Sequence, residues 1–169
     1  MLAVFAGTGV RRTEAAYIKV KDVKFVETFS GLIDIHQGKM GKFRTVAFDS
    51  EAGRYIRMYI ERHPDPDGYL FPGRFGGEKP AKNESLGRIL RFHAQAAGVE
   101  FDGCHQIRRT FATHWILKLP GEGYGAMLAR QLGHTVNGMT LGTYVKLTAE
   151  DIRRVMERNR LSAFAQMFK

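Results

Sequence analysis

Two pairs of adjacent arginines stand beside residue types that act on phosphate groups. Arg11 and Arg12 follow a glycine-rich turn, whereas Arg108 and Arg109 follow His105 by three and four residues. On a helix, residues three apart share a face, so His105 and Arg108 can approach one anionic group together. The planar fork of arginine fits phosphate oxygens better than the point charge of lysine. A single arginine is more often an ordinary surface charge, so a catalytic interpretation depends on the spacing of the whole set of residues.

Five short motifs are spaced along the chain. They are GTGVRRTEA at 7–15, GKMGKFR at 38–44, HQIRRTFATH at 105–114, LGHT at 132–135 and TLGTY at 140–144. In this order they resemble the TGLRxxE, GKGxKxR, HxLRHTFATH, LGHS and TLxxY signatures of the tyrosine recombinase, or phage integrase, family. Each motif alone is weak, whereas the ordered set is specific and spans nearly the whole chain. Arg109 departs from the pattern, which usually has a histidine at this position.

The resemblance implies a phosphoryl transfer in which Tyr144 is the nucleophile. Its phenol would attack the scissile phosphate, release a 5′-hydroxyl and leave a 3′-phosphotyrosyl bond. Arg11 and Arg108 would hold the non-bridging oxygens as charge develops in the transition state. Because a phenol has a pKa of about 10, its proton must be removed near neutral pH, and His105 is the candidate base or proton shuttle.

The same resemblance gives supporting roles to further residues. Lys39, in the turn of a predicted hairpin, would protonate the leaving 5′-oxygen, and His134 would donate a hydrogen bond to the phosphate. Glu14 lies three residues past Arg11 and would orient the arginines or the histidine. A one-residue shift in the turn would bring Lys42 into the place of Lys39. Candidate contacts to the DNA backbone are Arg12, Lys42, Arg44 and Arg109.

No metal or cofactor is expected for this chemistry. The sequence contains neither C-x-x-C nor H-E-x-x-H, and its carboxylates are not clustered at metal-ligand spacing. The energy of the cleaved bond is kept in the phosphotyrosyl linkage, so rejoining needs no nucleotide.

The charge balance agrees with double-stranded DNA as the partner. The 169 residues include 26 Lys and Arg against 17 Asp and Glu, which gives a formal net charge of +9 and a pI near 9.9. A basic domain of this size attracts polyanions, although such an excess can also serve solubility alone. The single cysteine, Cys104, excludes an internal disulfide. Because the start is not typical of a signal peptide and apolar runs are short, we expect a cytoplasmic, nucleoid-associated protein without a membrane span.

Periodicity and turn residues predict the elements that carry the motifs. An apolar helix over 2–6 is predicted to stop at Gly7-Thr8-Gly9, and a short helix follows over 11–17. Alternating apolar residues and glycine turns predict an antiparallel meander with strands at 22–26, 32–35 and 43–48. Residues 71–82 are predicted to form a loop, after which Asn83 or Ser85 caps a helix that runs to about 97. Further helices are predicted at 51–63, 105–117, 123–131, 138–145 and 148–159.

These elements predict an α+β fold, a mainly helical domain with a small three-stranded antiparallel sheet near the N-terminus. The resemblance implies that residues 1–169 form the catalytic domain of a tyrosine recombinase. We expect its first helices to be truncated and the N-terminal core-binding domain of the family to be absent. Family members act as homotetramers on DNA, and we expect this chain alone to be weakly active or inactive.

The function implied by the resemblance is site-specific DNA recombination by strand cleavage and rejoining. A type IB topoisomerase is an alternative, because it uses the same residues and the same phosphotyrosyl intermediate to relax a single duplex. A shortened DNA-binding regulator of a full-length recombinase is a second alternative. The complete set of catalytic residue types argues against a pure DNA binder.

Overall fold

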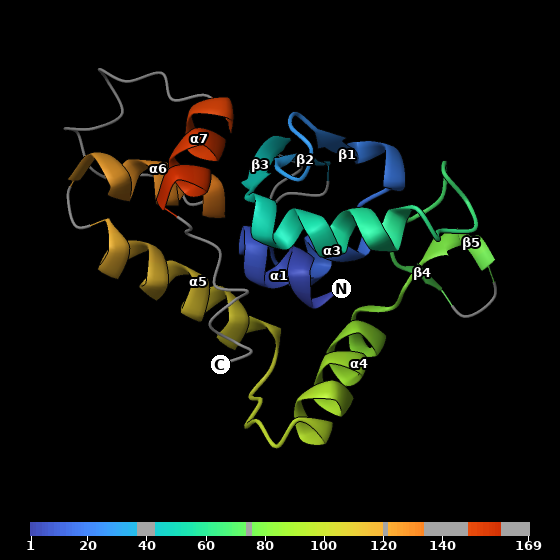
Figure 1. Ribbon diagram of the computed structural model, residues 1–169. Coiled ribbons are helices and arrows are strands. Elements are labelled where there is room, and N and C mark those ends of the chain that lie inside the picture. The colour runs from blue at the N-terminus through green and yellow to red at the C-terminus, as the bar shows by residue number, and fades with distance from the viewer. Residues whose placement is uncertain (37–42, 74–75, 120–121, 134–148, 160–169) are drawn as a thin grey trace.

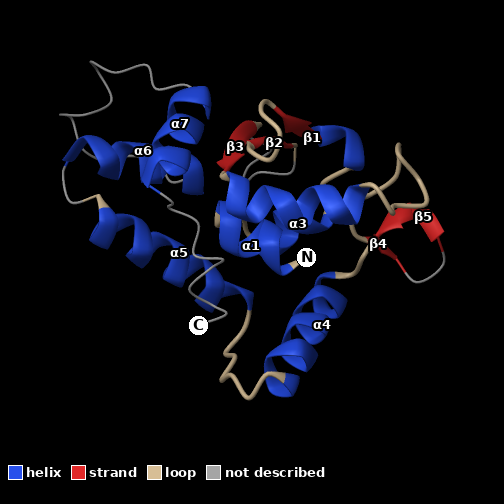
Figure 2. Cartoon of the chain, viewed as in Figure 1, coloured by secondary structure: helices blue, strands red, loops and turns tan. Residues whose placement is uncertain are grey.

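The structure is a computed structural model that describes residues 1–36, 43–73, 76–119, 122–133 and 149–159. Its elements are α1 (Leu2–Thr8), α2 (Arg12–Ala16), η1 (Val20–Asp22), β1 (Val23–Phe25), β2 (Gly31–Ile35), β3 (Arg44–Phe48), α3 (Ser50–Ile60), β4 (Pro72–Gly73), β5 (Gly76–Pro80), α4 (Asn83–Ala96), α5 (Cys104–Lys118), α6 (Glu122–Leu132) and α7 (Ala149–Asn159). Helix α1 lies at the centre and packs against α3, α5 and β3 (Figure 1). Helices dominate the fold, and the predicted three-stranded sheet is confirmed (Figure 2).

Strand β3 separates two hydrophobic cores. The sheet is antiparallel in the order β1-β2-β3, with Ile33 opposite Val46 and Ile35 opposite Arg44. Because successive strand residues point to opposite faces, Val46 and Phe48 enter one core while Ala47 enters the other. Both faces of β3 are therefore covered. The motif residues on its two sides keep fixed positions relative to one another.

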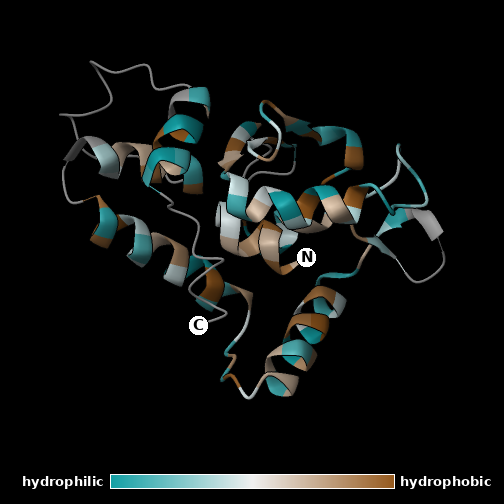
Figure 3. Ribbon diagram, viewed as in Figure 1, coloured by the Kyte–Doolittle hydropathy of each residue, from teal (hydrophilic) through white to brown (hydrophobic). Residues whose placement is uncertain are grey.

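The two cores join distant parts of the chain. The first core packs α1 and α3 against the sheet and includes Phe5 and Ile56, while the second packs α5, α6 and α7 around Trp115. Hydrophobic and hydrophilic residues are interspersed along α4 (Figure 3), and its apolar Leu86 and Leu90 are buried, as expected for an amphipathic helix. Among the described helices, none has both the length and the apolar character that crossing a membrane requires.

Some boundaries differ from those predicted. The segment 71–82, predicted as a loop, contains the antiparallel hairpin β4-β5. Helix α1 continues through Gly7 and Thr8 and ends at Gly9, whose φ of 68° is a left-handed conformation that glycine adopts without strain. Helix α4 begins at Asn83 itself after Lys82, so the predicted side-chain cap is wrong. The helix predicted at 138–145 lies outside the described residues.

Candidate active site

The first arginine motif lies at the junction of α1 and α2. Arg11 directly precedes α2, and its backbone N–H donates to Glu14 Oε2 at 2.8 Å. Its Nη1 also donates to Glu14 Oε1 at 2.8 Å, and its Nη2 lies 3.4 Å from the carbonyl oxygen of Gly133. Backbone and side chain of Arg11 are thus fixed by one carboxylate, which orients the guanidinium towards the end of α6.

Glu14 is the buried centre of this arrangement. Its side chain is 1% exposed and also accepts two hydrogen bonds from Arg44, from Nη1 at 2.7 Å and from Nη2 at 2.8 Å. Burial alone would raise the pKa of Glu14, but the hydrogen bonds from Arg44 and Arg11 outweigh burial and lower it to about 2. The carboxylate therefore stays charged, and it orients the arginines as the resemblance implies.

Arg108 approaches the same place from α5. It is buried, and it donates from Nη1 to the carbonyl oxygen of Gly9 and from Nη2 to that of Leu132, both at 2.7 Å. Burial, and next the nearby Arg11, lower its pKa to about 10, so it remains charged at neutral pH. A side chain at Gly9 would collide with Phe111 and Leu132, so the carbonyl that accepts from Arg108 lies in a tightly packed part of the backbone.

The cluster holds more positive than negative charge. Three guanidinium groups, of Arg11, Arg44 and Arg108, surround the single carboxylate of Glu14. Two like charges 4 Å apart at an effective dielectric constant near 20 repel by about 4 kcal/mol, so an anion brought to this cluster is attracted. A phosphate group supplies negative oxygens to which arginine N–H groups can donate.

The other described site residues are more exposed. His105 precedes Arg108 by three residues on α5 and is exposed, whereas Arg108 is buried. Arg12 is exposed and lies over Gly87 of α4. Arg109 is 65% exposed and forms a 3.4 Å ion pair with Asp102. These two arginines are accessible to an external anion, as a contact to a DNA backbone requires.

Four predicted residues lie outside the described part of the chain: Lys39, Lys42, His134 and Tyr144. Their neighbours are described. Arg44 opens the strand that follows the turn with both lysines, and Gly133, which precedes His134, lies against Arg11. Helix α7 begins at Ala149, five residues after Tyr144.

Arg44, predicted as a contact to the DNA backbone, is turned inward in the structure. Its side chain is 14% exposed, and both terminal nitrogens donate to Glu14. A guanidinium bound in this bidentate way uses the edge that would otherwise meet a phosphate. The contact of Arg44 with DNA stays a prediction from the sequence.

Sequence reasoning missed Gln131, a fully buried amide on α6. Its Nε2 donates to the carbonyl oxygens of Thr8 and Ala47, and its Oε1 accepts from the N–H of Ala47. This amide ties the end of α6, and with it the Leu132 and Gly133 carbonyls, to α1 and β3. A polar residue beside Leu128 and Leu132 on an apolar helix face was the available signal.

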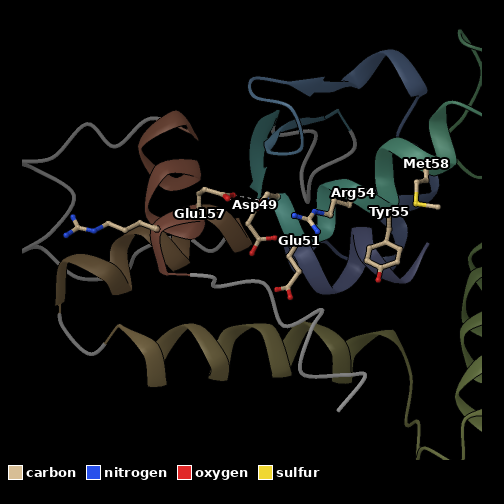
Figure 4. A pocket seen from close by; sticks show the side chains of 8 residues that line it. Asp49, Glu51, Arg54, Tyr55, Met58 and Glu157 are labelled. Atoms are coloured by element: carbon tan, nitrogen blue, oxygen red, sulfur yellow. Dashed lines mark hydrogen bonds between the residues drawn. The ribbon is translucent and has the colours of Figure 1, made fainter.

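A groove away from these residues lies between α3 and α7. It has a volume of about 740 Å³ and is lined by Asp49, Ser50, Glu51, Arg54, Tyr55, Met58, Glu157 and Arg158. Glu157 accepts hydrogen bonds there from the backbone N–H and hydroxyl of Ser50, the first residue of α3 (Figure 4). Of the predicted site residues that the structure describes, none lines this groove. In the described part of the chain, no three His, Cys, Asp or Glu residues are grouped to hold a metal ion.

Comparisons with known proteins agree with the motifs. Residues 1–151 match the model of the phage integrase family. The chain is 32% identical over 157 residues to the tyrosine recombinase XerA of Thermococcus kodakarensis and 28% identical over 156 residues to that of Pyrococcus furiosus. Each alignment covers 92% of this chain and 52% of the relative, so the chain spans about half the length of these proteins.

Solved structures show the same fold. A crystal structure of XerA recombinase matches with a TM-score of 0.65 and 25% identity, over 94% of this chain and 55% of that one. A post-cleavage complex of the XerH site-specific recombinase bound to a palindromic difH substrate matches with a TM-score of 0.64 and 26% identity. That match covers 79% of this chain and 37% of the other.

Proposed function

The chain belongs to the phage integrase family, and on that premise we propose that it cleaves and rejoins DNA strands through a phosphotyrosyl intermediate. The observation that supports this most is the placement of Arg11 and Arg108. They come from motifs almost a hundred residues apart, meet around Glu14 and leave the cluster with excess positive charge. A single DNA phosphodiester carries one negative charge, which this positively charged cluster would attract.

In the proposed reaction, the Tyr144 oxygen forms a bond to phosphorus while the bond to the 5′-oxygen breaks. Arg11 and Arg108 donate to the non-bridging oxygens, on which negative charge grows. His105 removes or relays the phenol proton, Lys39 supplies the proton to the leaving 5′-oxygen, and His134 donates to the phosphate. The reverse attack by a 5′-hydroxyl restores the strand and frees the tyrosine.

The partner in this proposal is double-stranded DNA, on which the protein acts as a homotetramer in site-specific recombination. The relatives named as recombinases support this reading over relaxation of a single duplex, since cleavage itself is common to both. The exposed Arg12 and Arg109 serve as backbone contacts. Arginines that contact phosphates make binding salt-dependent because counterions are released.

A suicide substrate tests the proposal. A nicked duplex loses the 5′-hydroxyl fragment after cleavage, so a covalent adduct accumulates and migrates as a larger species on a denaturing gel. Because we expect this chain alone to be weakly active or inactive, the test uses the full-length protein. We expect an adduct with the wild-type protein and none with Tyr144→Phe, which lacks only the nucleophilic oxygen and keeps DNA binding. A full-length wild-type protein without any adduct, or an adduct that survives Tyr144→Phe, contradicts the proposal.

A further inference from the structure

Arg44, which belongs to the motif at 38–44, contacts residues of two other motifs, those at 7–15 and 132–135. On one side its guanidinium binds Glu14, which holds Arg11 by backbone and side chain. On the other side it packs against Gly133, because a Cβ added there would lie 2.8 Å from Arg44 Cζ and 2.9 Å from its Nε and Nη1. The position therefore requires glycine for space as well as for its φ of 66°.

The remaining donor of Arg44 is also turned inward. Its Nε is buried without a hydrogen-bond partner in the described part of the chain, while Nη1 and Nη2 are both engaged by Glu14. A DNA phosphate could reach this guanidinium only by displacing Gly133 or Glu14. Arg44 also pairs with Ile35 in the sheet, which fixes the strand where it leaves the lysine-bearing turn.

We infer that Arg44 is a positioning residue that fixes Arg11 through Glu14 and the backbone leading to His134 through Gly133, without contacting DNA. This role rests on the proposed function, since it concerns the geometry of the same phosphate site. Preorganised donors act only in the correct place, and a displacement of about 1 Å can cost about 10²-fold in rate. Arg44 therefore affects the rate of cleavage and leaves the number of DNA contacts unchanged.

The first test compares Arg44→Gln with Arg154→Gln. Arg154 is 70% exposed on α7, so the control removes the same charge at a site away from the cluster. We measure the single-turnover cleavage rate at saturating DNA and the slope of log Kd against log salt. Arg44→Gln should cleave about 10²-fold more slowly with an unchanged slope, whereas Arg154→Gln should resemble wild type in both. A wild-type rate in Arg44→Gln, or a slope reduced by about 0.9 as for one lost phosphate contact, overturns the inference.

The path through Glu14 is tested by a double-mutant cycle. If Arg44 acts by holding Glu14, the double variant Arg44→Gln/Glu14→Gln should cleave no more slowly than the slower single variant. If the rate losses of the two single variants multiply in the double variant, Arg44 and Glu14 act independently on cleavage, and this path is contradicted. Arg44→Lys keeps the positive charge but cannot form the bidentate hydrogen bond. If Arg44→Gln fails to fold, this variant tests the positioning role of Arg44 instead. We expect it to cleave about 10-fold more slowly, and a wild-type rate would overturn the inference.

A measurement without cleavage separates this inference from the proposed function. In ¹⁵N NMR spectra, the guanidinium N–H signals of Arg11 report how freely that group rotates. We expect them to be resolved in the wild-type chain and averaged in Arg44→Gln. Unchanged Arg11 signals in Arg44→Gln contradict the role of Arg44, whereas a full-length wild-type protein that forms no adduct contradicts the proposed function alone.

Discussion

Two buried arginines in this molecule stand in opposite electrostatic surroundings. Arg108 is buried among backbone carbonyls, with Arg11 and Arg44 nearby and Glu14 as the shared carboxylate. Burial and the neighbouring arginines lower its pKa to about 10.

Arg153 of α7 is 4% exposed and is bound by two carboxylates, Glu150 and Glu27, and by the Ser30 hydroxyl. The hydrogen bonds that Arg153 donates to Glu150 raise the pKa of Arg153 despite its burial, and the one it donates to Glu27 adds to this effect.

The difference lies in the local balance of charge. Near Arg153 the two carboxylates Glu27 and Glu150 face two cations, because Glu150 also pairs with Arg154, so the charges balance within the described chain. The contacts of Arg153 tie α7 to the loop between β1 and β2.

Around Arg108 the described cations, Arg11 and Arg44 among them, outnumber the one carboxylate of Glu14, which favours the approach of an anion. In the proposed function, this local excess of positive charge, more than burial itself, is what suits Arg108 to hold a phosphate.

The largest expected change in the free energy of unfolding is the one caused by protonation of Glu14 at low pH. Because its pKa in the folded protein is about 2 and the ordinary value is 4.5, Glu14 stabilises the fold above about pH 4.5. This contribution, about 3 kcal/mol, should be lost as the pH falls from about 4.5 towards about 2. Urea unfolding at several pH values measures it, and Glu14→Gln should show a flatter dependence over this window. An equal dependence in both proteins would show that Glu14 is not held in this way.

A smaller loss is expected for Arg153→Met. The substitution removes the charged hydrogen bonds of α7, but Glu27 and Glu150 are 57% and 31% exposed and can be hydrated in the variant. We expect the free energy of unfolding to fall by about 2 kcal/mol. The matched variant Arg154→Met, at a position 70% exposed on the same helix, should change it by less than about 0.5 kcal/mol. Equal effects at the two positions would remove Arg153 as an anchor.

The smallest expected effect on stability distinguishes two glycines whose φ angles are nearly the same. Gly98 has φ +67° with open space around its Cα, whereas Gly133 has φ +66° and lies against Arg44. Gly98→Ala should cost about 1 kcal/mol from backbone strain alone. Gly133→Ala should cost about 1 kcal/mol more, because its methyl group displaces the guanidinium. Equal thermal unfolding of the two variants would show that the packing of Gly133 on Arg44 carries no energy.

The elements that the sequence predicted correctly are those with a strong local signal. Alternation gave the three strands, and apolar spacing gave α3, α5, α6 and α7. The hairpin β4-β5 was missed because residues 76–80, GGEKP, contain no β-branched or aromatic residue. The cap of α4 was misplaced by one residue, which is common at helix ends.

The site shows the same division between local and tertiary information. The ordered motifs predicted which residues form it, and the contacts of Arg11 with Glu14 follow from i,i+3 spacing. The inward turn of Arg44 and the role of Gln131 depend on residues 30 and 84 positions away, in Glu14 and Ala47. A one-dimensional pattern does not contain such contacts, whereas the packing of β3 between the two cores produces them.

The cleavage rate of Arg108→Ala on two suicide substrates tests most directly whether Arg108 balances phosphate charge. One substrate has an ordinary scissile phosphodiester, and the other has a methylphosphonate there, which removes one negatively charged oxygen. We predict a loss of about 10²–10³-fold on the first substrate and a loss at least about tenfold smaller on the second, where that charge is absent. Equal losses on both substrates, in a variant with wild-type circular dichroism, would contradict the assignment of this cluster as the phosphate site.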